Sequence, residues 1–299
     1  MIVGTGNVGA SIAFALLNQR TPVNELILTD INADDARGEA MDLSDALAVA
    51  PSYLKITAGD LTDAKDCDVI VITAGAPQKD GKQSRLALLK DNAKILKNIV
   101  EKIMKSGFKG IFIIVSNPVD VLSYLTWQWS GLPSHQVIGS GTVLDSARLR
   151  HRIAEELNIH PKSVHAYQVG EHGDSELTLW SLGDIGGEAL TDLIKKPARD
   201  KISQFVRDEA YKIVAEKGAT YYGIATCVAQ ILNCIFGDER RILTVSSHDD
   251  NTDTYNGFPA VIGRYGVLRR IDLKMTEKEQ IAFQKSANVL KEAIKKVTH

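Results

Sequence analysis

Short apolar runs alternate with longer amphipathic segments through the first half of the chain, and this alternation limits the fold more than any other feature. The runs that we predict as strands are residues 1–3, 26–29, 69–73, 111–116 and 137–140. Residues 8–18, 34–50 and 86–105 carry apolar residues at helical spacing. Because strands that are apolar on both faces belong to parallel sheets covered by helices, this half predicts an α/β fold with a doubly wound parallel sheet.

The regular alternation ends near residue 140. The remainder predicts a helix from Asp145, two helices within residues 200–236, a β segment at 242–273 and a final helix that opens with the capping box Thr276-Glu277-Lys278-Glu279. We therefore expect two domains: residues 1–139 with the doubly wound (Rossmann) sheet, and residues 140–299 with a second, α+β fold.

Composition narrows the function. The 299 residues, 44% of them hydrophobic, can bury a sizeable core, and a formal net charge of −2 gives no reason to expect nucleic acid or a membrane surface as partner. The three cysteines, Cys67, Cys227 and Cys234, lack CxxC spacing, so we expect neither disulfides nor a metal site. No apolar run approaches the roughly 18–20 residues that cross a bilayer, and no leader is apparent. We predict a cytoplasmic protein.

A glycine-rich turn follows the first strand. It reads Gly4-Thr5-Gly6-Asn7-Val8-Gly9 and opens a helix, and Asp30 ends the second strand about twenty residues later. The glycines (Gly4, Gly6, Gly9) allow a tight turn and close approach of a pyrophosphate to the helix start, while Asp30 would accept hydrogen bonds from a ribose. Since Asp30 would repel a 2′-phosphate, this pattern predicts NAD rather than NADP.

Two motifs in the second half carry side chains suited to acid–base chemistry. His172 lies in a loop between glycines, Gly170-Glu171-His172-Gly173-Asp174-Ser175. Upstream, Asp145 and Arg148 are three residues apart on a predicted helix, about 60° apart around its axis, so they can face one cleft. A histidine, a carboxylate that orients it and a guanidinium for a substrate carboxylate are the groups that reduction of a 2-oxo acid requires.

Together these motifs resemble the L-lactate/malate dehydrogenase family, over essentially the whole chain. The resemblance implies an NAD-dependent oxidoreductase of glycolysis and fermentation that interconverts a 2-oxo monocarboxylic acid such as pyruvate and its L-2-hydroxy acid, with His172 as proton donor and acceptor. It implies that residues 1–139 bind NAD and that residues 140–299 bind the substrate. It also assigns Arg85 to the catalytic loop, Asn117 and Thr220 to the substrate, and Thr73, Ala74, Gly75, Asn117 and Ile224 to the cofactor, beside Asn7 and Val8 of the turn. The Asn117–Pro118 bond is cis in the family.

Gln78 stands where malate dehydrogenases of the family carry an arginine, so a neutral amide disfavours dicarboxylates. The segment from Gln78 to Arg85 is one residue longer than the usual lactate pattern and lacks its proline. An L-2-hydroxyisocaproate-type enzyme for bulkier 2-oxo acids therefore remains an alternative. A malate dehydrogenase and a nucleotide-binding protein without turnover are less favoured.

Arg150 and His165 resemble the fructose 1,6-bisphosphate site of allosteric bacterial members of the family, where subunits meet. Arg150 follows Arg148 by two residues, about 200° around the helix, and cannot share its cleft. The resemblance implies a homotetramer with this bisphosphate as an effector.

Overall fold

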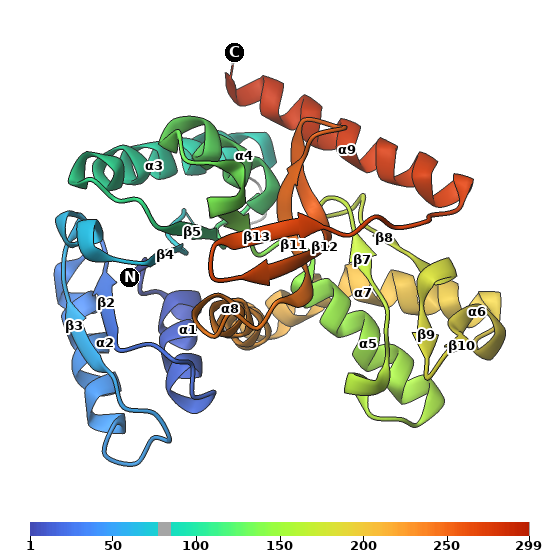
Figure 1. The fold of residues 1–299 in the computed structure, drawn as a ribbon, viewed down its shortest axis with the longest axis horizontal. Coiled ribbons are helices and arrows are strands. Elements are labelled where there is room, and N and C mark those ends of the chain that lie inside the picture. Colours follow the sequence, from blue (N-terminus) through green and yellow to red (C-terminus); the bar gives the residue numbers. More distant parts are fainter. Residues whose placement is uncertain (77–84, 299) are drawn as a thin grey trace.

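The structure, a computed structural model, describes residues 1–76 and 85–298 (Figure 1). Its first half forms the expected parallel sheet from β1 (Ile2–Val3), β2 (Glu25–Thr29), β3 (Lys55–Ala58), β4 (Val69–Ile72), β5 (Ile111–Ile114) and β6 (Val137–Gly139). In space these strands follow the order β3-β2-β1-β4-β5-β6. This is the order of a doubly wound dinucleotide-binding sheet, whose ligands bind at the carboxyl ends of the strands.

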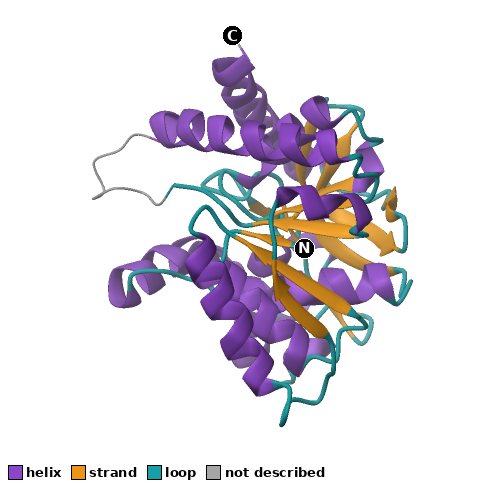
Figure 2. Ribbon diagram, turned by 90° about the vertical axis from the view of Figure 1, so that its left-hand side faces the viewer, coloured by secondary structure: helices purple, strands orange, loops and turns teal. Residues whose placement is uncertain are grey.

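Helices cover both faces of this sheet (Figure 2). The helices of the first half are α1 (Asn7–Asn18), α2 (Ala33–Ala46), α3 (Arg85–Ser106) and α4 (Val119–Ser130). Alternate residues of β4 face opposite cores, because Val69 and Val71 pack with α1 and α2 while Ile70 and Ile72 pack with α3 and α4. A strand that is apolar on both faces requires a helix on each side, as the sequence indicated.

The second half combines helices with short antiparallel strands. Its helices are α5 (Val143–Leu157), α6 (Leu190–Leu193), α7 (Lys196–Lys217), α8 (Tyr222–Phe236) and α9 (Glu277–Thr298). Its strands are β7 (Gln168–Val169), β8 (Leu177–Thr178), β9 (Asp184–Ile185), β10 (Glu188–Ala189), β11 (Arg241–Asp249), β12 (Thr254–Gly263) and β13 (Gly266–Arg270). The predicted α+β character of this half is confirmed.

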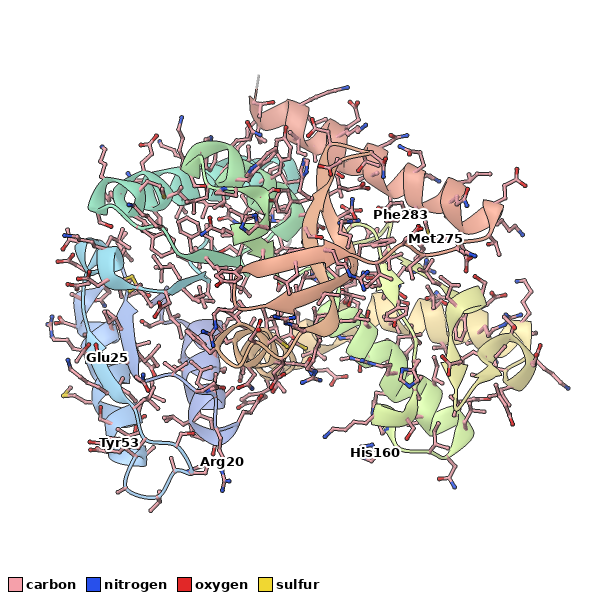
Figure 3. The ribbon with its side chains drawn as sticks, in the orientation of Figure 1. Arg20, Glu25, Tyr53, His160, Met275 and Phe283 are labelled. Atoms are coloured by element: carbon pink, nitrogen blue, oxygen red, sulfur yellow. The ribbon has the colours of Figure 1, made fainter. Side chains whose placement is uncertain are left out.

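The large sheet does not stop at the end of β6. Ser246 of β11 pairs antiparallel with Gly139 of β6, and β12 and β13 extend the same sheet to nine strands among the described residues. The boundary predicted between residues 139 and 140 therefore falls inside a continuous sheet. Phe283, at the inner side of α9, packs edge-to-face on Phe258 of β12, with ring centroids 5.3 Å apart, so α9 is anchored to this extension (Figure 3).

The expected elements differ from the structure at a few points. The strand β3 was not predicted, since its residues are half-buried or exposed and give no apolar run. The helix expected over residues 34–50 ends at Ala46. The capping box of α9 is confirmed, because Thr276 N–H donates to Glu279 Oε2 and Glu279 N–H to Thr276 Oγ1. Among the described residues, none of the helices has the length and apolar character to cross a membrane.

Candidate active site

The loop that carries His172 is held between two elements of the second half. Its first residue, Gly170, exchanges backbone hydrogen bonds of 2.8 Å with Gly257 of β12. Gly170 has φ +94°, and a Cβ there would lie 2.6 Å from Oγ of Ser286 on α9, so only glycine fits. Ser286 Oγ accepts a 2.8 Å hydrogen bond from the Glu171 N–H. The position of α9 therefore fixes the start of the loop.

A buried carboxylate fixes the backbone of His172 itself. The His172 N–H donates to Asp120 Oδ2 at 2.7 Å, and Ser246 Oγ donates to Asp120 Oδ1 at 2.6 Å. Burial raises the pKa of Asp120 to about 6, although both hydrogen bonds favour its ionised form. Sequence reasoning missed Asp120, because an acid in the first turn of a helix is already explained by the helix dipole.

The His172 ring is paired with Asp145. Its Nδ1 lies 2.6 Å from Asp145 Oδ2, and the Asp145 side chain is 3% exposed. The charge of Asp145 raises the pKa of His172 to about 9, against the opposing effect of burial. Burial would also raise the pKa of Asp145, but His172 and Arg148 outweigh it and hold that pKa below its usual value. The pair therefore carries a proton on His172 at neutral pH.

Arg148 lies beside this pair, as the helical spacing predicted. Its Nη1 donates to Asp145 Oδ1 at 3.1 Å, and its Nε lies 3.7 Å from Oε2 of Glu209 on α7. The guanidinium is 8% exposed, so two carboxylates compensate its burial. Carboxylates on two sides leave the guanidinium little freedom to turn, which suits a site for a substrate carboxylate.

These side chains line one cavity of about 840 Å³. Asn117, Asp145, Arg148 and His172 all border it, and further walls come from α3, α7 and α9. This volume lies in the range of small-molecule sites, in which a few polar groups orient the ligand.

Asp145, His172 and Glu176 each place one nitrogen or oxygen atom within 4.8 Å of the others, a donor set that could hold a metal ion. The neighbouring Arg148 and the raised pKa of His172 both oppose a cation there. The absence of a resident metal thus stays a prediction.

The glycine turn lies where β1 meets α1. Gly4 has φ +98°, and a Cβ at Gly6 would meet no atom within 4 Å, so Gly6 leaves open space at the start of α1. No side chain caps this helix, and its first N–H groups, at Asn7 and Val8, can bind an anion. Asp30 accepts from the Thr5 N–H at 2.6 Å at the end of β2. These features fit a dinucleotide whose pyrophosphate lies on the turn and whose ribose is near Asp30.

Neighbouring strand ends complete this region. Thr73 Oγ1 donates to the Gly4 carbonyl at 2.7 Å, so the segment of Thr73, Ala74 and Gly75 lies against the glycine turn. Asn92 of α3, which sequence reasoning missed, accepts from the Ala76 N–H and donates to the Asn117 carbonyl, both at 2.8 Å. The Asn117–Pro118 bond is cis.

Other expected residues lie away from the cavity or outside the described residues. Thr220 is in the connection between α7 and α8, not on a helix, and neither Thr220 nor Ile224 of α8 borders the cavity around His172. Gln78 lies outside the described residues. Arg85 begins α3, and only its backbone is described.

Arg150 and His165 are not joined by a hydrogen bond or ion pair within the described part of the chain. His165 is exposed, and its backbone pairs with Asp184. Arg150 is partly buried, and this burial lowers its pKa, with a further contribution from the nearby Arg241. The expected site of Arg150 and His165, formed where subunits meet, stays a prediction.

Sequence comparisons agree over both halves. Residues 1–139 match the lactate/malate dehydrogenase NAD-binding domain, and residues 142–299 match the lactate/malate dehydrogenase alpha/beta C-terminal domain. L-lactate dehydrogenase 1 of Peribacillus psychrosaccharolyticus is 47% identical over 303 residues, which cover 98% of this chain and 95% of that protein. L-lactate dehydrogenase 2 of Bacillus anthracis is 47% identical over 304 residues, which cover 98% and 96%.

Solved structures of lactate dehydrogenases are also similar to this chain over nearly its full length. A lactate dehydrogenase from a Medee basin deep-sea metagenome library superimposes with a TM-score of 0.96 at 45% identity, covering 100% of this chain and 98% of that one. The minor L-lactate dehydrogenase of Enterococcus mundtii, in its ligands-bound form, gives a TM-score of 0.96 at 42% identity, covering 99% and 97%. Its ligands-unbound form gives 0.89.

An NAD-binding half joined to a half that holds a protonated histidine places this chain among the NAD-dependent dehydrogenases. Since the two domain matches together span nearly its full length, the chain belongs to the lactate/malate dehydrogenase family.

Proposed function

We propose that this protein is an NAD-dependent L-lactate dehydrogenase that interconverts pyruvate and L-lactate. The observation that carries the proposal is the His172–Asp145–Arg148 cluster at the wall of one cavity. Relatives that are 47% identical over nearly the full chain are named L-lactate dehydrogenases, which supports this substrate over bulkier 2-oxo acids.

The chemistry follows from the geometry of the cluster. NADH, when bound, supplies the hydride. Arg148 binds the substrate carboxylate through a charge-assisted hydrogen-bonded pair. Because Asp145 engages Nδ1 of His172, the proton that reaches the substrate oxygen comes from Nε2. In the reverse direction, neutral His172 accepts the hydroxyl proton of lactate at the same atom.

The remaining expected residues take their roles from the family. We assign polarisation of the substrate carbonyl to Arg85, a hydrogen bond to the substrate oxygen to Asn117, and exclusion of dicarboxylates to Gln78. Thr220 would face the substrate and Ile224 the nicotinamide. Of the three whose side chains the structure describes, Asn117, Thr220 and Ile224, only Asn117 borders the cavity around His172.

A substrate panel tests the function. NADH oxidation is followed with pyruvate, oxaloacetate and 4-methyl-2-oxopentanoate under the same conditions. The highest kcat/KM with pyruvate is expected. A preference for 4-methyl-2-oxopentanoate would identify a hydroxyisocaproate-type enzyme, a preference for oxaloacetate a malate dehydrogenase, and no turnover a protein that only binds the nucleotide.

The proposal extends to regulation by fructose 1,6-bisphosphate at Arg150 and His165. The charge of Arg241 contributes to the lowered pKa of Arg150, which supports an anion site, because a bisphosphate would relieve the repulsion between the two guanidinium groups. We expect the bisphosphate to lower the apparent KM for pyruvate or to promote tetramers, more strongly at mildly acidic pH. Kinetics and sedimentation that show no response would leave both residues without this role.

We further propose a homotetramer that works in the cytoplasm. Large apolar side chains remain exposed along α1, α2 and α8, including Phe14 at 56%, Met41 at 66% and Tyr222 at 67%. Contact with another subunit would cover them. All three cysteines are unpaired, which suits a reducing compartment.

A further inference from the structure

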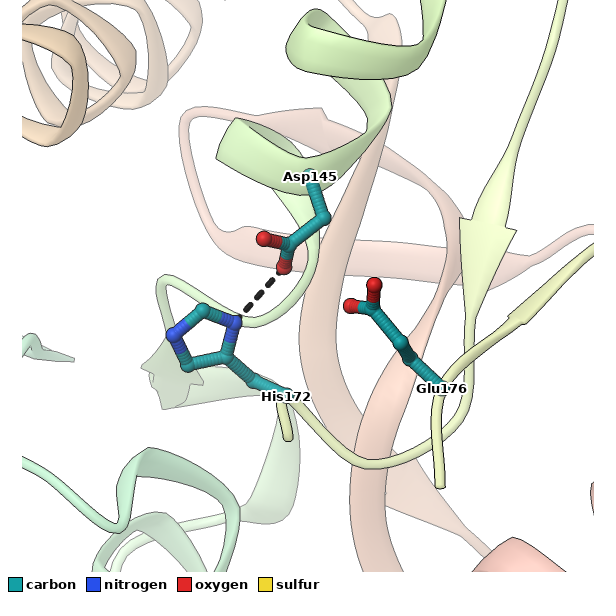
Figure 4. A group of neighbouring side chains, drawn as sticks. All are labelled: Asp145, His172 and Glu176. Atoms are coloured by element: carbon teal, nitrogen blue, oxygen red, sulfur yellow. Dashed lines mark hydrogen bonds and ion pairs between the residues drawn. The ribbon is translucent and has the colours of Figure 1, made fainter. Parts of the chain in front are cut away.

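Glu176 lies against the His172–Asp145 pair but takes no part in the transfer of the hydride or the proton. It follows the His172 loop, is 6% exposed and borders the same cavity. Figure 4 shows its carboxylate directed toward the hydrogen bond between His172 and Asp145. The three side chains bring their nearest polar atoms within 4.8 Å of one another.

The Glu176 carboxyl is incompletely satisfied. One hydrogen bond comes from the side chain of Gln168, but its Oε1 is buried without a hydrogen-bond partner. The neighbouring guanidinium of Arg148 is already engaged by Asp145 and Glu209. Burying a carboxyl oxygen without a partner costs stability, and a purely structural glutamate would be expected to use both oxygens.

Burial and the nearby charge of Asp145 raise the pKa of Glu176 to about 8, although His172 and Arg148 act in the opposite direction. Burial therefore favours the neutral carboxyl near pH 7, while the pKa of His172 is raised to about 9. Both groups change charge within the same alkaline range, at close distance in a low-dielectric site.

We propose that Glu176 is a positioning residue of this active site, a buried carboxyl beside the His172–Asp145 pair that, once ionised, holds the proton on His172. This inference rests on the proposed lactate dehydrogenase function. Glu176 makes no contact with substrate in this scheme. It acts through the charge state of His172.

The direction of the effect follows from the charges around the carboxyl. A negative charge close to the imidazolium stabilises it, so ionised Glu176 extends the protonated range of His172, and thus pyruvate reduction, toward alkaline pH. Several other charged groups lie around the His172–Asp145 pair or line the same cavity. They are Asp120 on α4, Asp145 and Arg148 on α5, Glu171 and Asp174 in the His172 loop, Arg207 and Glu209 on α7, and Lys285, Glu292 and Lys296 on α9. Among these carboxylates, burial also raises the pKa of Asp120, to about 6, but Asp120 accepts two hydrogen bonds whereas Glu176 has one oxygen without a partner.

The test is the Glu176→Gln variant, which keeps the shape of the neutral form but cannot ionise. The charge state of His172 is followed by the NMR shifts of its imidazole, assigned by comparison with His172→Asn. We expect the pKa of His172 to fall by about one unit or more in Glu176→Gln, as for a unit charge removed at this range. The alkaline limb of kcat/KM for pyruvate should fall with it. Turnover near pH 6 should change little.

Glu292→Gln is the matched control, since it removes a negative charge from an exposed position on the same cavity. Its His172 titration should match the wild type. An unchanged His172 pKa in Glu176→Gln, or an equal shift in Glu292→Gln, would overturn the proposal. If Glu176→Gln folds poorly, Glu176→Asp, which withdraws the charge, should lower the His172 pKa by a smaller amount, and no change there would overturn the proposal as well.

Two readouts separate this inference from the proposed function. Wild-type turnover of pyruvate tests the function alone, whereas the NMR titration requires no turnover. Thermal unfolding provides a further check of Glu176 itself. Because the folded pKa of Glu176 lies above the ordinary 4.5, wild type should lose more stability than Glu176→Gln as pH rises from about 5 to about 8; the losses that come from His172 and Asp120 are common to both. A stability difference that stays constant over this range would also overturn the proposal.

Discussion

Replacing Asp145 by asparagine should move the pH range in which the enzyme reduces pyruvate. Asp145 is the largest cause of the rise in the His172 pKa, from an ordinary 6.5 to about 9. That rise corresponds to about 3 kcal/mol in favour of the imidazolium, since one pKa unit is worth about 1.4 kcal/mol. Asparagine keeps the shape of Asp145 but removes the charge, so the pKa of His172 should fall to about 6.5 or below.

The consequence depends steeply on pH. Near pH 6 most of the His172 in Asp145→Asn would still be protonated, whereas near pH 8 only about 3% would be. Protonation alone should therefore make the loss of kcat/KM for pyruvate about twentyfold larger near pH 8 than near pH 6. Lactate oxidation, which requires neutral His172, should gain relative activity at low pH. If the substitution only misplaced the His172 ring, the loss of kcat/KM would be the same at every pH.

The assay is the initial rate of NADH oxidation over a pH series, at pyruvate concentrations well below KM. Glu155→Gln, an exposed acid on the same helix, serves as the control and should keep the wild-type profile. If the alkaline limb of Asp145→Asn remained near pH 9, Asp145 would not be the group that holds the proton on His172.

Three further changes address neighbouring residues. His172→Asn should lower kcat by about 10²–10⁴-fold and leave NADH binding, measured by fluorescence titration, nearly intact; more than a tenth of wild-type turnover with chemistry rate-limiting would contradict its role. Gln78→Arg should shift the kcat/KM ratio from pyruvate toward oxaloacetate, and an unchanged ratio would mean that this side chain does not face the substrate. Asp120→Ala removes the acceptor of the His172 N–H and the Ser246 hydroxyl, so the free energy of unfolding in urea should fall by about 1–3 kcal/mol, with slower turnover. Unchanged values for both would refute the anchoring role of Asp120.

The sequence revealed those parts of the fold and site that depend on local pattern. Three-residue spacing on a helix brought Arg148 beside Asp145, and the glycine turn before α1 has the open space at Gly6 that its spacing predicted. The strand β3 was not predicted because it is short and half-exposed, so no apolar run indicates it.

Asp120 and Glu176 show which residues cannot be predicted from local sequence pattern. Both are acids that an isolated sequence favours at the surface, yet both are buried beside His172. Their environment comes from segments far away in the chain, since Asp120 meets Ser246 and the His172 loop, and Glu176 meets Asp145 and Gln168. The spacing of residues within one motif could not have identified Asp120 and Glu176 as site residues, because their partners come together only in the folded protein.

The continuation of the sheet from β6 into β11 has a practical meaning for protein engineering. Ser246, which pairs with Gly139 at that junction, also donates to Asp120, and Asp120 holds the backbone of His172. A chimera that joins the first half of this chain to the second half of a relative would therefore exchange one end of a hydrogen-bond chain that reaches the catalytic loop. Exchanges that keep Asp120, Gly139 and Ser246 compatible should preserve turnover better than those that follow the domain boundary alone.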